Sequence, residues 1–346
     1  MSIRNSIVNI MSSFISDKEA RNKFSGRYKR KSVSISQYKE YQHLLSEKEH
    51  IAAERQQLSR ERERYDVIRN VGPWYEYLKD YYFSSPSEKK DTVSFKHSGQ
   101  IGDIIYSLPA LAALTDKYSN TAAHLYLDLT SRFQRIGFSL TKNTLLNQKL
   151  FDVIEPLLAI QPYISSVTVY KNEDIDFDLD LFRHKILFLS CGDITKWYQY
   201  LFPVSYDTSK PWITVDKTDN VADSAIVIAK SPRMSNPLID WSFLVKYPKV
   251  YFVGINEEYE AIKEIIPKIE WIKTKDYLEL ARVISGAKLF IGNQSSPFSV
   301  AEGLKVPRLL CLPVQTPVAT PAGNSCAVFC VQSCFESLVK DFWENK

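Results

Sequence analysis

A glycine-containing loop that ends in an acidic residue is the first feature of this sequence that could do chemistry. Residues 96–103 read Lys-His-Ser-Gly-Gln-Ile-Gly-Asp, between a segment typical of a strand and a segment typical of a helix. Gly99 and Gly102 allow positive φ and the close approach of a ligand to the backbone. Asp103 would lie at the helix start, beyond the carboxyl end of the strand, where open α/β sheets bind ligands.

A carboxylate at this place is compatible with two roles. Asp103 could act as a general base on a hydroxyl of an acceptor, or it could only cap the helix, since Asp is a preferred capping residue. The glycine spacing differs from the three-glycine dinucleotide fingerprint, and an acidic side chain would repel a pyrophosphate bound in the same loop. The sequence therefore favours an acceptor hydroxyl as the partner of Asp103, with capping as the alternative.

A second strand–loop–helix unit carries the residue types of a diphosphate site. Residues 286–307 pass from an apolar strand through Gly-Asn-Gln-Ser-Ser-Pro into a helix. Pro297 suits the first helical turn, and Ser295 or Ser296 suits the cap. Amides at a helix start, together with the positive end of the helix dipole, bind phosphate without requiring a metal.

Side chains of this unit could add to such a site. The hydroxyls of Ser295, Ser296 and Ser299 could donate to a diphosphate. Glu302, about one turn further, could accept hydrogen bonds from sugar or ribose hydroxyls, or it could pair with a nearby Lys or Arg. Neither a metal nor another cofactor is expected: Cys326 to Cys330 read as a buried strand, and no well-placed His completes a ligand set.

Two blocks in which strands alternate with helices must position these loops. Such alternation predicts an α/β fold with parallel sheets that helices cover on both faces. A proline-containing polar stretch at 203–224 separates the blocks. The expected organisation is a helical arm (1–90), a first Rossmann-like domain (91–215), a second (222–332), and a C-terminal helix (333–346) that could pack back on the first domain.

The strands of the first block are expected near 93–95, 125–127, 167–169 and 186–189, and those of the second near 226–228, 250–253, 271–272, 289–291, 309–312 and 328–331. A helix is expected near Trp241.

The N-terminal arm differs from the rest in composition. Residues 1–70 hold 15 Lys or Arg against 9 Asp or Glu, whereas the whole chain of 346 residues has a net charge of +4. An apolar stripe at residues 3–15 precedes a basic cluster at 27–31, a pattern that fits either a membrane surface or packing on protein, including a second copy. Further on, Leu44, Ile51, Leu58 and Tyr65 repeat every seven residues, but Glu occupies most of the complementary positions, so a solvated helix competes with a coiled coil. An aromatic cluster at 74–83 is expected to pack on the first domain.

Bulk features exclude several classes of protein. No run reaches the roughly 18 apolar residues of a spanning helix, and polar residues interrupt the N-terminus where a secretory signal would be apolar. Five cysteines in 346 residues make no disulfide framework. We expect a cytoplasmic protein, which could lie at the inner face of the membrane, and we expect no nucleic-acid partner.

The two motifs together resemble heptosyltransferase-type (glycosyltransferase family 9-like) GT-B enzymes. The likeness rests on Gly102-Asp103 followed by Pro109-Ala, on Gly-Asn-Gln-Ser-Ser-Pro, and on the segment 301–307, and it covers roughly residues 92–345. It implies two Rossmann-like domains facing a central cleft, and a nucleotide-diphospho-sugar donor held mostly by the second domain. It also implies Asp103 as the base of an inverting, metal-independent transfer to a glycan, lipid-linked or protein acceptor.

The sequence departs from this family at the donor site. Relatives commonly carry Asp-Ser-Gly and then a His, where this chain has Gln294-Ser-Ser and Ser299. They also place a Lys directly before a Trp, where this chain has Asp240, so that Lys230 or Arg233 could substitute. Nucleotide and sugar are therefore not predicted.

A Gly-then-Glu turn that contacts ribose in the family is matched by Gly254 with Glu257 or Glu258. The candidate catalytic residue is Asp103, and the candidate donor- and phosphate-binding residues are Gly102, Lys230, Ser231, Arg233, Gly254, Glu257, Asn293, Gln294, Ser295, Ser296, Pro297, Ser299 and Glu302.

Three alternatives to a transferase stay open. The chain could be a non-catalytic module that binds a nucleotide-sugar or glycan, or a scaffold whose function resides in the arm. A nucleotide-sugar epimerase could also use two such lobes, although the Gly-Asp motif fits transfer better.

Overall fold

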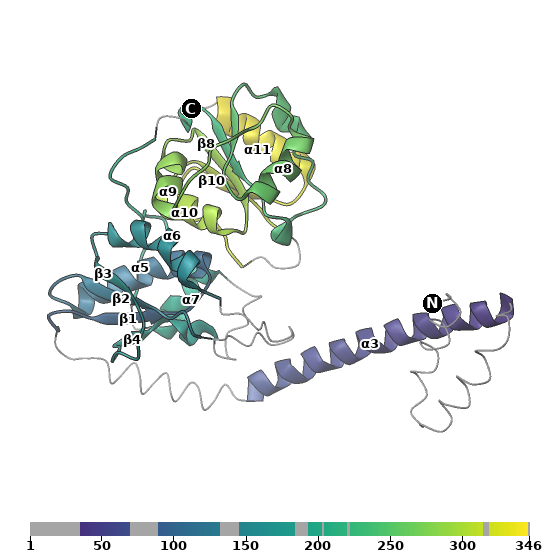
Figure 1. Ribbon diagram of the computed structural model, residues 1–346, viewed down its shortest axis with the longest axis horizontal. Coiled ribbons are helices and arrows are strands. Elements are labelled where there is room, and N and C mark those ends of the chain that lie inside the picture. Colours follow the sequence, from purple (N-terminus) through teal and green to yellow (C-terminus); the bar gives the residue numbers. More distant parts are fainter. Residues whose placement is uncertain are drawn as a thin grey trace. The chain divides into compact units, whose positions relative to one another are not determined.

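A computed structural model describes residues 35–69, 89–131, 145–183, 193–202, 204–219, 222–313 and 318–344. The chain divides into two compact units, Met1–Arg69 and Asn70–Lys346. The first unit is described through the helix α3 (Ile35–Arg69), and the second holds two parallel sheets with their helices (Figure 1).

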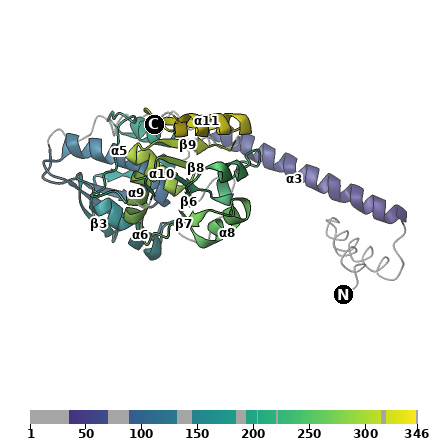
Figure 2. The same ribbon diagram turned by 90° about the horizontal axis from the view of Figure 1, so that it is seen from above.

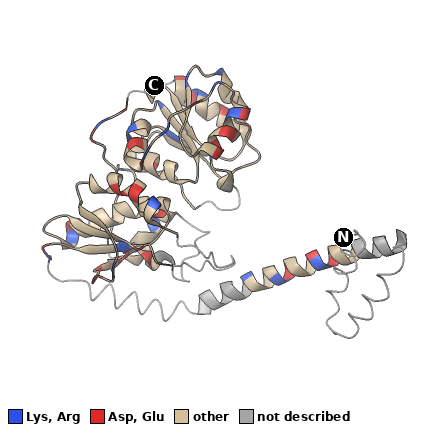
Figure 3. Cartoon of the chain, viewed as in Figure 1, with Lys and Arg blue, Asp and Glu red and all other residues tan. Residues whose placement is uncertain are grey.

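The helix α3 confirms the expected helical character of residues 35–69. Basic and acidic side chains intersperse along the part of α3 whose side chains are described (Figure 3). Ile51 is 44% exposed and Leu58 is 63% exposed, so two of the seven-residue repeat positions face solvent in this chain. The apolar stripe, the basic cluster and the aromatic cluster lie outside the described residues.

The first sheet follows from short apolar strands separated by helices. Its elements are β1 (Ser94–His97), α5 (Ile101–Tyr118), β2 (Ala123–Leu127), α6 (Gln148–Ala159), β3 (Ile164–Val169), β4 (Phe177–Asp178), the 3₁₀ turn η1 (Leu179–Arg183) and α7 (Ile194–Leu201). The strand order is β3-β2-β1-β4, and every pair is parallel. Along β2 the burial alternates strictly, as expected for a strand. The short strand β4 was not expected from the sequence, and the strand expected at 186–189 lies outside the described residues.

The second sheet has the doubly wound order. Its elements are β5 (Ile226–Ala229), η3 (Pro232–Met234), η4 (Ser242–Lys246), β6 (Val250–Phe252), α8 (Asn256–Ile265), β7 (Glu270–Trp271), α9 (Tyr277–Ser285), β8 (Leu289–Asn293), α10 (Ser296–Leu304), β9 (Arg308–Cys311), β10 (Cys326–Phe329) and α11 (Gln332–Glu344). The parallel strands run in the order β10-β9-β8-β5-β6-β7, so the winding reverses between β5 and β8. Rossmann-like sheets bind ligands at the carboxyl ends of the two strands where this reversal occurs. The helix expected near Trp241 is only the 3₁₀ turn η4.

The C-terminal helix α11 packs on the second sheet rather than back on the first domain. Phe335 is fully buried, stacks on Phe329 of β10 with ring centroids 4.1 Å apart, and contacts Trp241 at 5.3 Å. Figures 1 and 2 both show α11 beside strands of this sheet. The sequence could not reveal this, because one apolar helical face fits either sheet.

The segment between the sheets is packed rather than loose. The amides of Trp212 and Ile213 both donate to the Gly303 carbonyl, at 2.9 and 3.1 Å, and both side chains are buried. Helix α10 also lies against α5 of the first lobe, and α6 lies against α9. One continuous cluster of buried apolar residues contains members of both lobes, such as Leu108 and Ala301.

Gly303 provides a test of this packing. A Cβ at residue 303 would lie 2.5 Å from Ile213 Cδ1 and 2.9 Å from Trp212 Nε1. We expect Gly303→Ala to lower the free energy of unfolding by about 1–3 kcal/mol, measured by urea denaturation, because overpacking a filled interior strains it. Adding Ile213→Val, which removes the nearest atom, should recover part of the loss. If the double variant instead loses the sum of the stabilities lost in the two single variants, residues 303 and 213 do not interact, which would contradict this contact.

Candidate functional site

The loop after β1 is hydrogen-bonded to a buried cluster of polar side chains. His97 is fully buried, its Nδ1 accepts the Gly99 amide hydrogen at 2.8 Å, and its Nε2 lies 3.3 Å from the Tyr198 hydroxyl. A neutral His97 protonated on Nε2 satisfies both contacts. The Tyr198 hydroxyl also lies 3.5 Å from the carbonyl oxygen of Asp103. Sequence reasoning missed His97 and Tyr198, although His97 adjoins the glycine motif.

Acidic residues from β4 and from the 3₁₀ turn η1 complete this edge of the first sheet. Asp180 accepts a hydrogen bond from the Ser98 amide at 3.1 Å, and Asp178 pairs with Lys96 at 2.8 Å. Partial burial lowers the pKa of Lys96, but the hydrogen bond from Lys96 to Asp178 and the nearby carboxylates outweigh it and raise the net pKa. These bonds connect β1 and the loop that follows it to β4 and the turn η1.

Asp103 lies in the first turn of α5, where it is half-buried. The N-cap residue of this helix is Gln100, whose side chain makes no cap hydrogen bond. Asp103 is therefore not the N-cap residue, although its charge still interacts favourably with the helix dipole.

The starts of α5 and α10 meet, and this contact brings the two sequence motifs together. A Cβ placed on Gly102 would lie 3.8 Å from Ser296 Cα and 3.9 Å from Ser299 Oγ. The residue before Asp103 therefore touches the first turn of α10 in the other lobe. Sequence alone placed these motifs about 190 residues apart.

Hydroxyl groups at the start of α10 are largely engaged within the protein. Ser295 donates to the Asn293 carbonyl at 3.2 Å, and the fully buried Ser299 donates to the Ser296 carbonyl at 2.7 Å. Ser296 shares a hydrogen bond of 2.5 Å with the Tyr277 hydroxyl. This geometry therefore does not favour the expectation that all three hydroxyls bind a diphosphate. The helix start itself lies where the sequence predicted it, and Ser295 to Pro297 are half-buried there.

Tyr277 is a site residue that the sequence did not identify. Its side chain belongs to the first turn of α9, and burial raises its pKa, so the phenol stays neutral at physiological pH. The charge of Glu258 adds to this increase, which places Glu258 near Tyr277.

The amide side chains of the loop after β8 also serve the protein itself. Asn293 accepts from the Ser231 amide at 3.1 Å and donates to the Ser231 carbonyl at 2.6 Å, which joins the ends of β5 and β8. Gln294 Oε1 accepts from the amides of Val318 and Ala319, each at 2.9 Å. These residues shape the site rather than offer it their side-chain oxygens.

Other predicted residues surround the point where the winding reverses. Lys230 follows β5, and its charge acts on Cys311 at the end of β9, although burial dominates and raises the pKa of that thiol to about 12. Arg233 belongs to η3, and its side chain lies outside the described residues.

The turn after β6 requires glycine. Gly254 has φ of 146°, and a Cβ there would lie 2.7 Å from Phe252 Cζ and 2.9 Å from Glu258 Oε2. Glu257 is exposed, whereas Glu258 is half-buried beside this turn. Of the two acids that the sequence offered, the structure places Glu258 at the site edge.

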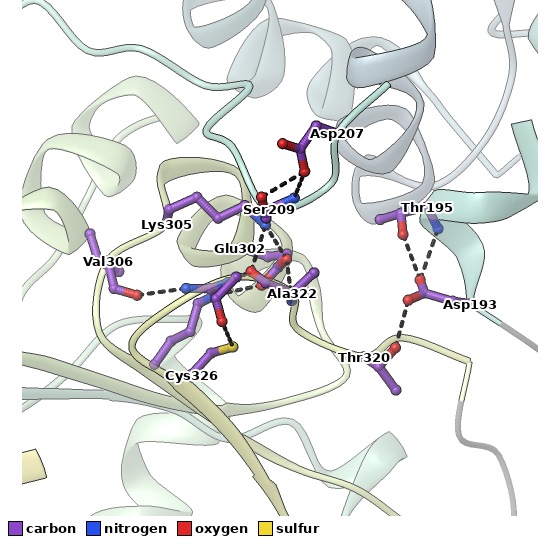
Figure 4. A network of polar contacts seen from close by, with 12 residues as sticks. Asp193, Thr195, Asp207, Ser209, Glu302, Lys305, Val306, Thr320, Ala322 and Cys326 are labelled. Atoms are coloured by element: carbon purple, nitrogen blue, oxygen red, sulfur yellow. Dashed lines mark hydrogen bonds and ion pairs between the residues drawn. The ribbon is translucent and has the colours of Figure 1, made fainter. Parts of the chain in front are cut away.

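Glu302 corrects the sequence interpretation most clearly. Its carboxylate is 1% exposed and pairs with Arg308, which is fully buried, and with Lys305. It also accepts from the Ala322 amide at 3.0 Å (Figure 4). Glu302 therefore neutralises buried cations, and its oxygens are not presented to sugar or ribose hydroxyls.

A hollow of about 720 Å³ opens on the first lobe between α6 and the strands β2 and β3. Its lining mixes apolar and polar side chains, namely Tyr126, Gln148, Phe151, Val167, Thr168, Val169, Lys171 and Glu173. Size and lining are those of a surface that could hold part of a ligand.

Clusters of metal-ligating side chains and helices able to span a membrane are both absent from the residues that are described. In that part of the chain, no three His, Cys, Asp or Glu side chains come together as a metal site. None of the helices there combines the length and apolar character needed to cross a bilayer.

Comparison with known proteins gives matches in fold. No protein-family model and no curated protein matches the sequence. The E. coli heptosyltransferase WaaC with ADP-2-deoxy-2-fluoro heptose aligns with TM-score 0.50 and 10% identity, over 72% of this chain and 99% of that one. E. coli ADP-heptose LPS heptosyltransferase II aligns with TM-score 0.51 and 11% identity, over 73% and 99%. A glycosyl transferase family 9 structure from Veillonella parvula aligns with TM-score 0.50 and 14% identity, over 75% and 93%.

These matches confirm the predicted fold class. The body of the chain has the GT-B fold of heptosyltransferase-type structures.

The Glu302 cluster yields a stability prediction. We expect Glu302→Gln to lower the free energy of unfolding by about 3–5 kcal/mol, because it leaves the buried Arg308 charge uncompensated. Asp216→Asn is the control, because it breaks an exposed ion pair: Asp216 lies 2.8 Å from Arg282 and is 54% exposed. This change should lower the free energy of unfolding by at most about 1 kcal/mol. Unchanged stability of Glu302→Gln with lost nucleotide binding would instead return Glu302 to the ligand site.

Proposed function

We propose that this chain is a glycosyltransferase that moves a sugar from a nucleotide-diphospho-sugar to a hydroxyl of a glycan, lipid-linked or protein acceptor, with inversion and without a metal. The observation that carries this proposal is the contact between Gly102 and Ser296, because it brings the residue directly before Asp103 against a helix start from the opposite lobe. A base and an anion site so close together suit the transfer of a group between two substrates.

The chemistry follows from what each side can supply. Asp103 accepts the proton of the acceptor hydroxyl while that oxygen forms a bond to the anomeric carbon. The bond from this carbon to the diphosphate breaks, and the nucleoside diphosphate leaves with its electron pair. The start of α10 stabilises the departing charge through backbone amides and the helix dipole, and Lys230 adds a positive charge at the end of β5. Attack opposite the leaving group inverts the anomeric centre.

Features of the second sheet also suit a nucleotide bound near the start of α10. Its winding reverses between β5 and β8, whose ends are joined by Asn293 and Ser231. Gly254 lets a ligand approach the backbone after β6, and Glu258 beside it could accept ribose hydroxyls.

The acceptor belongs on the first lobe in this proposal. The hollow beside α6 opens near the carboxyl ends of β2 and β3, and β1, which leads to Asp103, runs parallel to them. Aromatic and polar side chains together suit a partly polar ligand such as a glycan.

The fold matches support the donor class. Two of the matched structures are described with ADP-2-deoxy-2-fluoro heptose or as an ADP-heptose enzyme. In this chain Gln294, Ser295 and Ser296 occupy the loop, so we leave nucleotide and sugar to experiment. We further propose that the protein acts in the cytoplasm, where its N-terminal arm, residues 1–70, mediates self-association or contact with the inner face of the membrane.

Asp103 is tested by a neutral, isosteric change. We expect Asp103→Asn to reduce release of nucleoside diphosphate in the presence of cell-derived acceptors by about 10²–10⁴-fold, the usual contribution of a general base. Donor affinity measured by calorimetry should stay within a few-fold. Asp116→Asn, an exposed acid in the last part of the same helix, is the matched control. Unchanged turnover of Asp103→Asn would remove Asp103 as the base.

The nucleotide site is tested by thermal shift with ADP-, UDP-, GDP- and CMP-sugars. A ligand present at 100 times its dissociation constant stabilises the folded state by about 2.7 kcal/mol, so one base should stand out. We expect Glu258→Gln to weaken that ligand about 10–100-fold, as for the loss of a hydrogen bond to a charged group. Glu257→Gln, at the exposed neighbour, should leave affinity unchanged. The opposite pattern would assign the ribose contact to Glu257.

A second function is favoured by one observation. The side chains of Asn293, Gln294, Ser295 and Ser299 all bond within the protein, which also suits a module that binds a nucleotide-sugar or glycan without turnover. Clear nucleotide binding by the wild-type chain without release of nucleotide from any donor would favour this alternative.

A further inference from the structure

A short segment between β9 and β10 joins the two lobes. We call residues 318–322 the strap. On the second lobe, the Gln294 side chain accepts from the Val318 and Ala319 amides, each at 2.9 Å, and Gln294 and Ala319 are buried. The far end is fixed too, since Ala322 donates to Glu302 at 3.0 Å and accepts from Arg308 at 2.6 Å. The strap is thus bound to the loop that follows β8.

The same strap caps a helix of the first lobe. The Val318 carbonyl accepts from the Ile194 amide at 2.9 Å, and the Thr320 hydroxyl donates to Asp193 Oδ2 at 2.5 Å (Figure 4). The other oxygen of Asp193 caps α7 by accepting from the amide and hydroxyl of Thr195, at 3.0 and 2.7 Å. One strap residue therefore bonds to Gln294 through its amide and to α7 through its carbonyl.

Helix α7 continues this connection to Asp103. Tyr198 lies one turn beyond Ile194, is fully buried, and approaches both His97 and the Asp103 carbonyl with its hydroxyl. Rigid hydrogen-bonded elements therefore run from the loop after β8, through the strap and α7, to the first turn of α5.

We propose that Gln294 is a positioning residue, which sets Asp103 relative to the donor loop through the strap and α7. This inference rests on the proposed function, because it assigns Asp103 and the start of α10 to one reaction. The amide oxygen of Gln294 is suited to the task, since a carbonyl oxygen accepts two hydrogen bonds at once. Displacing a reacting group by about 1 Å can cost about 10²-fold in rate, so a loosened strap lowers turnover without removing any group that touches substrate.

The experiment compares variants that break the bonds of the strap to the second lobe and to the first lobe. Gln294→Ala removes the acceptor of the two strap amides, and Gln294→Glu retains an acceptor of the same length. Thr320→Val breaks the hydrogen bond between the strap and Asp193 of the first lobe, on an exposed residue. Amide hydrogen exchange at Val318, Ala319 and Ile194, calorimetry with the nucleotide found by thermal shift, and steady-state kinetics are measured on all three.

We expect Gln294→Ala to raise the rate of amide hydrogen exchange at Ile194 by at least about tenfold, because losing one hydrogen bond costs about that factor in stability. The kcat should fall about 10–100-fold, while nucleotide affinity changes by less than about threefold. Gln294→Glu should restore both quantities. Thr320→Val should lower kcat in the same direction and also leave nucleotide affinity unchanged.

Two results would overturn the proposal. One is unchanged exchange at Ile194 with nucleotide affinity weakened by more than about tenfold, which would make Gln294 a donor ligand. The other is normal kcat in Thr320→Val despite faster exchange at Ile194. If the wild-type chain transfers no sugar, the proposed function fails separately, and exchange at Ile194 in Gln294→Ala still decides whether the strap couples the lobes.

Discussion

The close approach of two helix starts from different lobes is the constraint on which the candidate site depends. Gly102 in α5 lies so close to Ser296 in α10 that a Cβ on residue 102 would be in van der Waals contact with the Cα of Ser296. Because each helix start directs unbonded amides and a partial positive charge outward, their meeting creates a place that favours anions. Asp103, in the first turn of α5, lies where the helix dipole stabilises a carboxylate.

Helix α10 is the element through which the parts of the site are connected. It contacts α5 of the first lobe and α9 of its own lobe, and Gly303 receives the linker through two hydrogen bonds. From Phe298 to Gly303 every residue of α10 is buried. A helix held from several directions is a rigid platform, which suits electrostatic stabilisation because the dipoles need no reorganisation during reaction.

Several residues whose types suggested ligand binding are instead used to hold this platform. Glu302 balances Arg308, Asn293 joins two strand ends, and Gln294 holds the strap. Around the start of α10 the second lobe therefore presents backbone amides and the helix dipole more than side-chain groups.

The sequence by itself determined the local structure and the order of the motifs. Strand-forming runs, Gly254 after β6 and Pro297 at a helix start specify conformation through their own backbone preferences, so the two parallel sheets and the Ser295-Ser296-Pro297 helix start could be predicted. Gly99 and Gly102 do not use the positive φ that glycine allows. Tertiary structure alone decided which neighbour each polar side chain meets. Glu302 could equally pair with a cation or a ribose, α11 could pack on either sheet, and Glu258 rather than Glu257 reached the site edge. The physical reason is that a polar group is satisfied by partners far away in the chain, and only folding brings Arg308, the strap and Tyr277 to their places.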